Sequence, residues 1–352
     1  MSLKRVGIIG SGNWGTTAAR VIAENVQNLD DFDNTVKMWC FDEKVNGESL
    51  VKIINTVHEN VKYLPGYPLP ETIVAYADVV EVCNTCNYLV FVIPHQFLEE
   101  TLKDMIGHVL PGSVGISLIK GVTFLDGEIE LVTDTIERVL KIKCGSLMGA
   151  NIANDIANRE YCESTVAFPN EEIGNDWLRA FDCYYFHVER IQDIVCQQVC
   201  GTLKNIIATA GGLVDGLGLG QSTKAAIMRR GFVECYKFAE WYWPNRGVKI
   251  ETMMESCGFG DIVASSYGGR NRKCAEYFVK TGKTFAQCEA DLLNGQKLQG
   301  VLAAAEIYRV LKKKNAIKLF PLISTIHLID RMKCPPQTIF HPDGEHLDIE
   351  VD

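Results

Sequence analysis

The chain has 352 residues, of which 47% are hydrophobic and 22% charged, as in a folded globular protein, and at ~150 residues per domain it has room for two. Its formal net charge of −9 argues against a nucleic acid or an anionic membrane as partner, but leaves room for a local basic pocket. No apolar run approaches the ~18 residues of a membrane span and no secretory signal is recognisable, so we expect a cytosolic protein.

The thirteen cysteines are spread from Cys40 to Cys334 without the spacing of a disulfide framework. Cys83 and Cys86 form a C-x-x-C pair, with no second pair or histidine at zinc spacing. We therefore expect reduced, mostly buried thiols and no metal site.

The first half of the chain alternates short β-type runs with helix-type stretches. Several runs are apolar throughout, Leu89–Ile93 most plainly, as expected for strands covered by helices on both faces. This alternation predicts a parallel, doubly wound α/β sheet, in which ligands bind beyond the carboxyl ends of the strands. The predicted strands are Arg5–Ile9, Val36–Phe41, Ile73–Ala77, Tyr88–Ile93, Gly112–Leu118 and Cys144–Met148.

The first predicted strand leads into Gly10-Ser11-Gly12-Asn13-Trp14-Gly15, and a helix-type stretch follows from Thr16 to Asn25. A strand, a G-x-G-x-x-G turn and a helix, in that order, form a phosphate cradle at a helix N-terminus. The first glycine permits the tight turn, the second lets a pyrophosphate approach, and the third allows close helix–strand packing. A glycine-rich connection without a ligand is the alternative.

Asp42 follows the second predicted strand, where dinucleotide-binding folds place an acid on the adenosine ribose. An NADP site would favour a nearby arginine, and none stands here, so the sequence favours NAD. Asp42 lies 27 positions beyond Gly15, further than the usual ~20, and the polar stretch Asn25–Asn34 accounts for the excess. An ordinary solvated loop acid remains the alternative.

Three later strands also end in residues suited to a site. The fourth runs into Pro94, which fits a strand-to-helix turn, and Phe97, which could cover a cofactor. The fifth ends at Lys120, placed to hold an anion or polarise a carbonyl, and the sixth leads to Asn151, which could orient a lysine amine or bind nicotinamide. A surface lysine and a turn asparagine are the alternatives.

Beyond about Gln192 the pattern becomes helical. We therefore predict a cofactor-binding domain over residues 1–192 and an all-helical domain over 193–352, with an irregular tail at Pro335–Asp352. The predicted helices are Asp193–Gly211, Thr223–Tyr242, Arg272–Thr281, Glu289–Leu293 and Val301–Lys312.

Lys204 is the most chemically suggestive residue of the second half. Its helical neighbours three and four positions away carry no charge, and desolvation on such a patch lowers a lysine pKa toward that of a useful general acid. Asn205 could support the geometry of the lysine or the substrate. A lysine that extends its ammonium to solvent from an interface is the alternative.

Gly268-Gly269-Arg270-Asn271-Arg272 precedes a predicted helix. The arginine fork and the helix N-terminus together suit a phosphate dianion better than a carboxylate, although a solvated basic loop would have the same composition. A second glycine-bracketed loop, Asn294–Gly300, could reach over a cofactor or simply join two helices.

Taken in order, these motifs closely resemble the NAD-dependent glycerol-3-phosphate dehydrogenases of the cytosolic eukaryotic type. The resemblance implies an N-terminal Rossmann domain, a helical C-terminal domain, a homodimer, and interconversion of dihydroxyacetone phosphate and sn-glycerol 3-phosphate with NAD. The motifs that carry it are Gly10–Gly15, His58–Gly66, Pro94–Phe97, Leu118–Gly121, Met148–Ala153, Leu203–Asn205, Gly268–Arg272 and Asn294–Gly300.

Carried across by motif, Lys204 is the expected acid/base and Asp261 the site aspartate, with Lys120 and Asn151 around the carbonyl. A buried pair of lysines would need an acid, and Asp261 is the candidate partner. The resemblance further implies substrate contacts from Lys120, Asn205, Ser265, Arg270 and Asn271. The cofactor contacts it implies are Gly10, Ser11, Gly12, Asn13, Trp14, Gly15, Phe41, Asp42, Pro94, Phe97, Lys120, Ala153, Arg270, Lys297 and Gln299.

This chain departs from the family pattern in two places. Ser265 stands where threonine is common, and Val301–Ala304 replaces a segment that usually contains Pro-Glu. Two other functions stay open on the residues alone: a related dehydrogenase of a 3-hydroxy acid or phosphorylated sugar acid, and a non-catalytic nucleotide-binding sensor. Lys204, Lys120 and Arg270 together favour an enzyme, since a sensor would not need all three.

Overall fold

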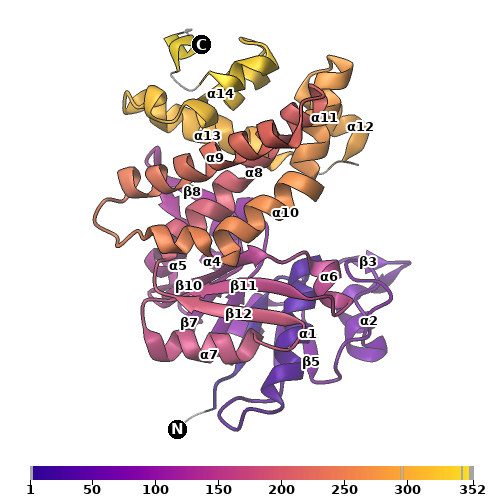
Figure 1. Cartoon of the computed structure of the whole chain (residues 1–352). Helices are drawn as coiled ribbons and strands as arrows, with labels where there is room; N and C mark the ends of the chain where they lie inside the picture. Colours follow the sequence, from indigo (N-terminus) through magenta and orange to yellow (C-terminus); the bar gives the residue numbers. More distant parts are fainter. Residues whose placement is uncertain (1–2, 294, 296, 342–343, 349–352) are drawn as a thin grey trace. The chain divides into compact units, whose positions relative to one another are not determined.

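The computed structural model describes residues 3–293, 295, 297–341 and 344–348 (Figure 1). The chain forms two compact units, one of Met1–Thr123 with Glu130–Ile194 and the other of Phe124–Ile129 with Val195–Asp352. The second unit thus takes in a short segment from the first half of the chain, at the tip of a hairpin. Among the helices in the described ranges, none has the length and apolarity needed to cross a lipid bilayer.

The first unit is built on an eight-stranded sheet in the order β12-β11-β10-β7-β6-β1-β2-β5. All pairings are parallel except β10 with β11. From β5 to β10 the order is that of a dinucleotide-binding Rossmann sheet, which confirms the predicted fold class. The strands are β1 (Val6–Ile9), β2 (Val36–Trp39), β5 (Ile73–Tyr76), β6 (Tyr88–Phe91), β7 (Val114–Ser117), β10 (Lys143–Ala150), β11 (Cys162–Ala167) and β12 (Phe186–Ile191).

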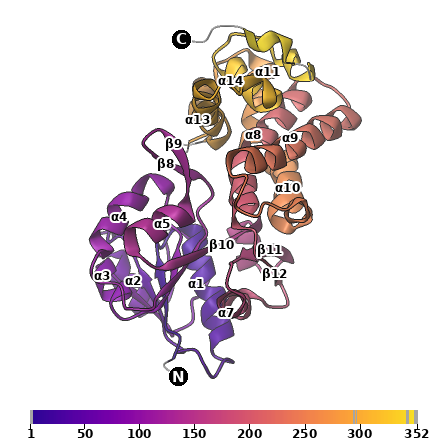
Figure 2. The same ribbon diagram turned by 90° about the vertical axis from the view of Figure 1, so that its left-hand side faces the viewer.

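Helices cover both faces of this sheet, which explains its apolar strands. Along β6, Tyr88 and Val90 belong to one hydrophobic core, while Leu89 and Phe91 belong to another on the opposite face, because successive strand residues point to opposite sides. Figure 2 shows α1 on one side of the sheet and α3, α4 and α5 on the other. The helices of this unit are α1 (Asn13–Val26), α2 (Leu50–Val57), α3 (Val79–Cys83), α4 (Leu98–Met105), α5 (Val132–Leu140), α6 (Ala153–Ala157) and α7 (Glu171–Phe181), with a 3-10 turn at His95–Phe97.

The six predicted strands are confirmed, but the sequence analysis missed the two at the β12 edge of the sheet. These strands read CESTVA and FHVERI, and their polar positions hide the apolar run that marks a buried strand. Two short ribbons were also missed, β3 (Lys44–Val45) with β4 (Glu48–Ser49) and β8 (Val122–Leu125) with β9 (Glu128–Leu131).

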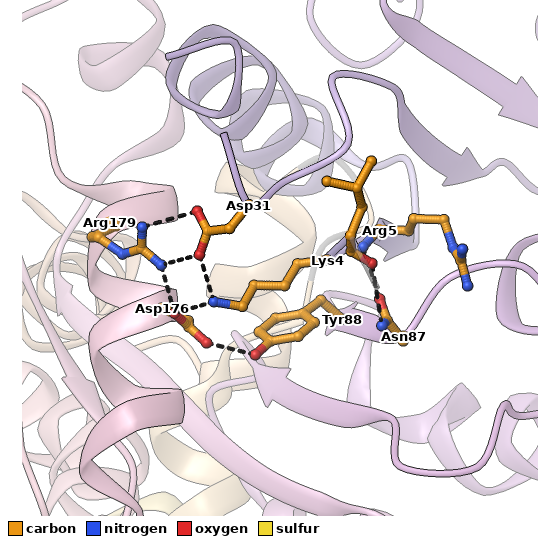
Figure 3. Close-up of polar contacts among 8 residues, drawn as sticks. Lys4, Arg5, Asp31, Asn87, Tyr88, Asp176 and Arg179 are labelled. Carbon is orange, nitrogen blue, oxygen red and sulfur yellow. Dashed lines mark hydrogen bonds and ion pairs between the residues drawn. The ribbon is translucent and has the colours of Figure 1, made fainter. Parts of the chain in front are cut away.

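An ion-pair cluster ties α7 to the start of β1 (Figure 3). Lys4 Nζ lies 2.7 Å from Asp31 Oδ2 and 2.6 Å from Asp176 Oδ1, and Arg179 contacts the same two carboxylates. The Tyr88 hydroxyl donates to Asp176 Oδ2 at 2.6 Å. The hydrogen bond from Arg179 holds the pKa of Asp31 well below its usual range. This cluster fastens the helix that precedes β12 to the Rossmann core.

The second unit is helical in its described part beyond Val195, as predicted. Helices α10 and α14 were missed, and α11 starts two residues earlier than the Arg272 predicted, so Arg270 lies in its first turn. The tail contains 3-10 turns at Pro336–Phe340 and Glu345–Asp348. The helices are α8 (Ile194–Gly216), α9 (Gln221–Tyr242), α10 (Asp261–Gly268), α11 (Arg270–Thr281), α12 (Phe285–Leu292), α13 (Gln299–Lys313) and α14 (Pro321–Asp330), with a 3-10 turn at Ile250–Met254, a π turn at Ser256–Gly260 and a 3-10 turn at Ile317–Leu319.

The cysteines match their predicted environment. Eleven of the thirteen are buried, and Cys183 and Cys334 are partly buried. They behave as small apolar side chains of the two cores.

Candidate active site

The turn between β1 and α1 has the shape of an anion cradle. Gly10 has φ +121°, a backbone conformation that favours glycine, and a Cβ on Gly15 would lie 2.2 Å from the Gly10 carbonyl oxygen. A Cβ on Gly12, by contrast, would meet nothing within 4 Å. Gly12 is the N-cap of α1, so the open space lies at the end of the helix where backbone N–H groups lack helical partners. These residues fit a bound pyrophosphate.

Asn60, which the sequence analysis did not single out, stabilises this turn through side-chain hydrogen bonds. Its fully buried side chain donates from Nδ2 to the Ser11 carbonyl oxygen at 2.9 Å and to Thr16 Oγ1 at 2.8 Å. The Asn60 Oδ1 atom accepts from the Tyr63 backbone N–H at 3.1 Å. Its only sequence signal was its place inside the His58–Gly66 stretch.

Asn13 and Trp14 use their side chains to brace the turn. Asn13 Nδ2 donates to the Tyr63 carbonyl oxygen and to Asn154 Oδ1, both at 2.8 Å. The Trp14 ring packs edge-on against Phe186, with centroids 6.0 Å apart. Contact between these two residues and the cofactor therefore stays a prediction, and the backbone N–H groups are the atoms available for it.

Several of the predicted cofactor contacts in the loops after β2 and β6 are exposed to solvent. Phe41 is 73% exposed and Phe97 52% exposed, and Pro94 is exposed beside the second of them. The exposed Asp42 accepts from Ser49 Oγ at 2.6 Å, so its carboxylate is oriented by the ribbon that follows it. Large exposed apolar side chains at a ligand-binding edge suit a cofactor surface, and these contacts remain predictions.

A hydrogen-bonded chain fixes the lysine at the end of β7. Lys120 Nζ donates to the Gly149 carbonyl oxygen at 3.0 Å and to Asn151 Oδ1 at 3.1 Å. Asn151 Nδ2 in turn donates to Ser164 Oγ at 2.8 Å. The expectation that Asn151 orients a lysine amine is confirmed. Ser164 was missed because it lies on β11, one of the unpredicted strands.

Ala153 is the first residue of α6 and is buried, next to the same group. Its carbonyl oxygen accepts from Thr17 Oγ1 at 3.4 Å, which links α6 to α1 and thus to the glycine turn. Its predicted contact with the cofactor is not tested by this geometry.

In the second unit, Lys204 lies in a buried ion pair. Its Nζ atom is 2.5 Å from Asp261 Oδ1 and 3.0 Å from Ser265 Oγ. Lys204 is 7% exposed and Asp261 3% exposed. The lysine comes from α8 and both partners come from α10, one helical turn apart. The predicted pairing with Asp261 is confirmed, and serine supplies the hydroxyl contact that threonine would make.

Asn205 and Asn271 bond to each other beside this pair. Asn271 Nδ2 donates to Asn205 Oδ1 at 3.0 Å, and Asn271 Oδ1 accepts from the Gly300 backbone N–H at 2.8 Å. A Cβ on Gly300 would lie 2.2 Å from Thr209 Oγ1. The start of α13 can therefore pack this closely against α8 only because residue 300 is a glycine. The exposed Arg270 precedes Asn271 in the first turn of α11, after the N-cap Gly269.

The second glycine-bracketed loop is anchored by Glu289. Lys297 Nζ lies 2.7 Å from Glu289 Oε1, and the Leu298 backbone N–H donates to Glu289 Oε2 at 2.8 Å. Gln299 begins α13. The other polar positions of this predicted motif, residues 294 and 296, lie outside the described residues. Lys297 would have to exchange this carboxylate for a cofactor anion, and its predicted role stays untested.

Comparison with known proteins assigns the chain to a family. A sequence model of the NAD-dependent glycerol-3-phosphate dehydrogenase N-terminus matches residues 5–174, and that of the C-terminus matches residues 193–341. The chain belongs to the NAD-dependent glycerol-3-phosphate dehydrogenase family. This confirms the family resemblance carried by the motifs and identifies NAD as the cofactor.

Individual relatives match over nearly their whole length. The chain is 44% identical to a glycerol-3-phosphate dehydrogenase 1-like protein of Xenopus tropicalis over 92% of both chains. It is 42% identical to the cytoplasmic glycerol-3-phosphate dehydrogenase (NAD+) of Drosophila melanogaster, over 98% of this chain and 95% of that one. A solved glycerol-3-phosphate dehydrogenase of Saccharomyces cerevisiae superposes with a TM-score of 0.93 at 37% identity, covering 98% of this chain and 100% of that one.

One further network in the second unit, absent from the sequence analysis, is centred on the partly buried Asp215. Asp215 Oδ2 lies 2.7 Å from Lys224 Nζ and 2.8 Å from Arg272 Nη1. The Lys224 ammonium also lies 4.4 Å from the centroid of the Tyr267 ring. The network joins α8, α9, α10 and α11 around the start of α11, where Arg270 stands.

Proposed function

We propose that this chain interconverts sn-glycerol 3-phosphate and dihydroxyacetone phosphate with NAD, and that Lys204 is its general acid/base. The observation that carries this assignment is the buried contact of Lys204 Nζ with Asp261 Oδ1 at 2.5 Å and Ser265 Oγ at 3.0 Å. A buried lysine whose Nζ atom is held in one place can give a proton as the ammonium and take one as the neutral amine.

Bound NAD would supply the hydride acceptor for oxidation at C2 of glycerol 3-phosphate, and bound NADH the hydride donor for the reverse reaction. In the oxidation Lys204 takes the proton of the C2 hydroxyl as the carbonyl forms. In the reduction the Lys204 ammonium gives that proton to the carbonyl oxygen. Asp261 stabilises the ammonium form of Lys204, and Ser265 fixes the direction of its Nζ atom.

Lys120 would stabilise negative charge that develops on the substrate carbonyl oxygen. Its ammonium is oriented in advance by Gly149 and Asn151, so little reorganisation is needed during the reaction. Asn151 is held in turn by Ser164, which makes Ser164 a positioning residue.

The substrate phosphate would bind at the start of α11. Arg270 offers a bidentate guanidinium there, and the first turn of the helix offers backbone N–H groups. Asn205 and Asn271, already bonded to each other, supply further amide groups for the substrate hydroxyls or phosphate.

On the cofactor side, the Gly10–Gly15 turn would hold the pyrophosphate, and Ser11 contributes a backbone N–H group to it. Asp42 would accept from the adenosine ribose hydroxyls. Phe41, Pro94, Phe97 and Ala153 would contact the apolar faces of NAD, with Lys297 and Gln299 on the loop that we expect to cover it.

The family resemblance supports a homodimer. Light scattering on the purified protein should give twice the chain mass of 39.2 kDa, and a mass of one chain would contradict the proposal. The matched Drosophila relative is named cytoplasmic, which supports the same compartment here and is checked by fractionation of the native cell.

A steady-state assay that follows NADH consumption tests the proposed reaction. The purified chain should turn over with dihydroxyacetone phosphate and much more slowly with 3-keto acids. Faster turnover with a keto acid would identify a different dehydrogenase. Binding of NADH without turnover of any of these substrates would identify a sensor.

A further inference from the structure

A second recess lies at the edge of the sheet opposite the cofactor turn. The turn, Lys120 and Asn151 follow the carboxyl ends of β1, β7 and β10, whereas the recess is formed at the amino ends of β1, β2 and β6. A four-residue strand separates two such edges by ~13 Å. The cavity has a volume of about 430 Å³, and its polar walls come from Arg5, Asp33, Thr35, Lys37, Asn84 and Thr85.

Two cations meet in this recess at one threonine. Arg5 Nε donates to the Thr85 carbonyl oxygen at 2.6 Å, and Lys37 Nζ donates to Thr85 Oγ1 at 3.0 Å. Across the described part of the chain, neither cation has a carboxylate within ion-pair distance. The Arg5 side chain extends away from the neighbouring ion-pair cluster around Lys4 (Figure 3). Both positive charges are therefore available to a ligand.

Asp33 sets the polarity of the opposite wall. Its Oδ1 atom accepts from the Thr35 backbone N–H at 2.8 Å, which orients the carboxylate just before the amino end of β2. The charges of Arg5, Lys37 and Asp33 all influence the pKa of the Cys86 thiol, which also lines the recess. Burial raises the pKa of this thiol, Lys37 and Arg5 oppose that rise, and Asp33 adds to it. The recess thus carries two positive charges and one negative charge.

This lining selects a class of ligand. The guanidinium, the ammonium, the Thr35 hydroxyl and the Asn84 amide can donate to an oxyanion, while the carboxylate can accept from a hydroxyl. The Thr85 hydroxyl already donates to the Glu81 carbonyl oxygen at 2.8 Å. The walls include no aromatic side chain on which a base could stack. We propose that the recess binds a small, non-aromatic organic phosphate that carries hydroxyl groups, with the phosphate between Arg5 and Lys37 and a hydroxyl on Asp33.

Calorimetric titration of the full chain with inorganic phosphate tests the anion half of this site. The titrations are made in the Arg270→Ala background, which removes the phosphate contact proposed for the other unit. Lys37→Gln and Arg5→Gln should each weaken the remaining binding about tenfold or more, since each removes a charged hydrogen-bond donor. Lys52→Gln neutralises an exposed lysine of the same unit and should leave it unchanged.

Asp33→Asn should tighten inorganic phosphate binding, because it removes the like charge from the recess, and a gain of binding cannot arise from misfolding. In the Arg270→Ala protein with an unchanged recess, glycerol 2-phosphate should bind more tightly than inorganic phosphate, because it adds the hydroxyl contact to Asp33. Equal phosphate affinity in Lys37→Gln, Arg5→Gln and the parent, or loss of all phosphate binding in the parent Arg270→Ala protein, would overturn the proposal. Neither result bears on the assay of the dehydrogenase reaction, so the two proposals fail separately.

Discussion

In the first unit, six consecutive residues, Gly10–Gly15, form the anion cradle, whereas in the second the two partners of Lys204 stand 57 and 61 positions along the chain. The cradle depends on backbone conformation and on room for a ligand. The lysine depends on a buried ion pair between two helices. The first arrangement is encoded locally and leaves a motif, while the second exists only in the folded domain. The two should therefore respond differently to single substitutions.

Asp261→Ala should have the largest effect on stability, since it leaves a buried ammonium without its carboxylate. Breaking such a pair costs about 3–5 kcal/mol, so the free energy of unfolding in urea should fall by that amount. Lys280→Ala removes a surface lysine paired with Glu276 and is the control. A loss below about 1 kcal/mol in Asp261→Ala would mean that the pair is not buried in solution.

Gly15→Ala should be nearly as disruptive in the first unit, because its Cβ would lie 2.2 Å from the Gly10 carbonyl oxygen. We expect a loss of about 3 kcal/mol in unfolding free energy. Gly12→Ala is the matched variant, since its Cβ meets nothing within 4 Å. It should keep most of the stability and weaken NADH binding, measured by fluorescence. Equal destabilisation by the two substitutions would contradict the assigned difference between the glycines.

Arg270→Ala should raise KM for dihydroxyacetone phosphate about 10–100-fold, because it removes a charged hydrogen bond to the phosphate. Glyceraldehyde, a phosphate-free analogue, should be turned over as slowly by the variant as by the parent. Steady-state kinetics with both compounds checks this. An equal loss of activity with both compounds would show that Arg270 does not act through the substrate phosphate.

The contact between Glu234 on α9 and the start of α14 predicts a pH dependence of stability in the helical unit. Its carboxylate accepts from the Leu322 and Ile323 backbone N–H groups at 2.8 and 3.0 Å, at the start of α14. Burial raises the pKa of this carboxyl to about 7, while those two hydrogen bonds oppose the rise. The folded state therefore binds the proton more tightly than the unfolded state, and this contribution to stability is lost as pH rises through about 7.

Relative to Glu234→Gln, the parent should lose about 2 kcal/mol of unfolding free energy between pH 5.5 and pH 8. Urea titrations of both proteins at the two pH values give the comparison, in which other titrating groups cancel. The same pH dependence in both proteins would show that Glu234 does not titrate in this range.

Ser164→Ala should have the smallest effect, about 1 kcal/mol or roughly fivefold in kcat/KM, because it removes one hydrogen bond from the Asn151 amide. A positioning role predicts that kcat falls while the melting temperature and the KM for NADH stay unchanged. Ser164→Thr keeps the hydroxyl and should recover part of the loss. A lower melting temperature with unchanged kcat would assign Ser164 to packing alone.

The same contrast explains what the sequence could predict. The Rossmann strands and the glycine turn follow from local patterns, and Lys120 and Asn151 follow from strand order, because neighbouring parallel strands end at one edge. Strands β11 and β12 were not predicted because polar residues interrupt their apolar runs. Ser164 lies on β11 and was missed for the same reason. The Asp215–Lys224–Arg272 network had no local signal at all. Asp261 was predicted only through the family resemblance, because it lies 57 positions from Lys204 and no local pattern links the two residues.

The central claim is that Lys204 moves the proton, and Lys204→Ala tests it most directly. Steady-state kinetics with dihydroxyacetone phosphate should show kcat lowered ~10²-fold or more, with the dissociation constant for NADH unchanged and with partial recovery on addition of a small primary amine. Lys280→Ala should retain the parent kcat. A Lys204→Ala protein with near-normal kcat would contradict the account.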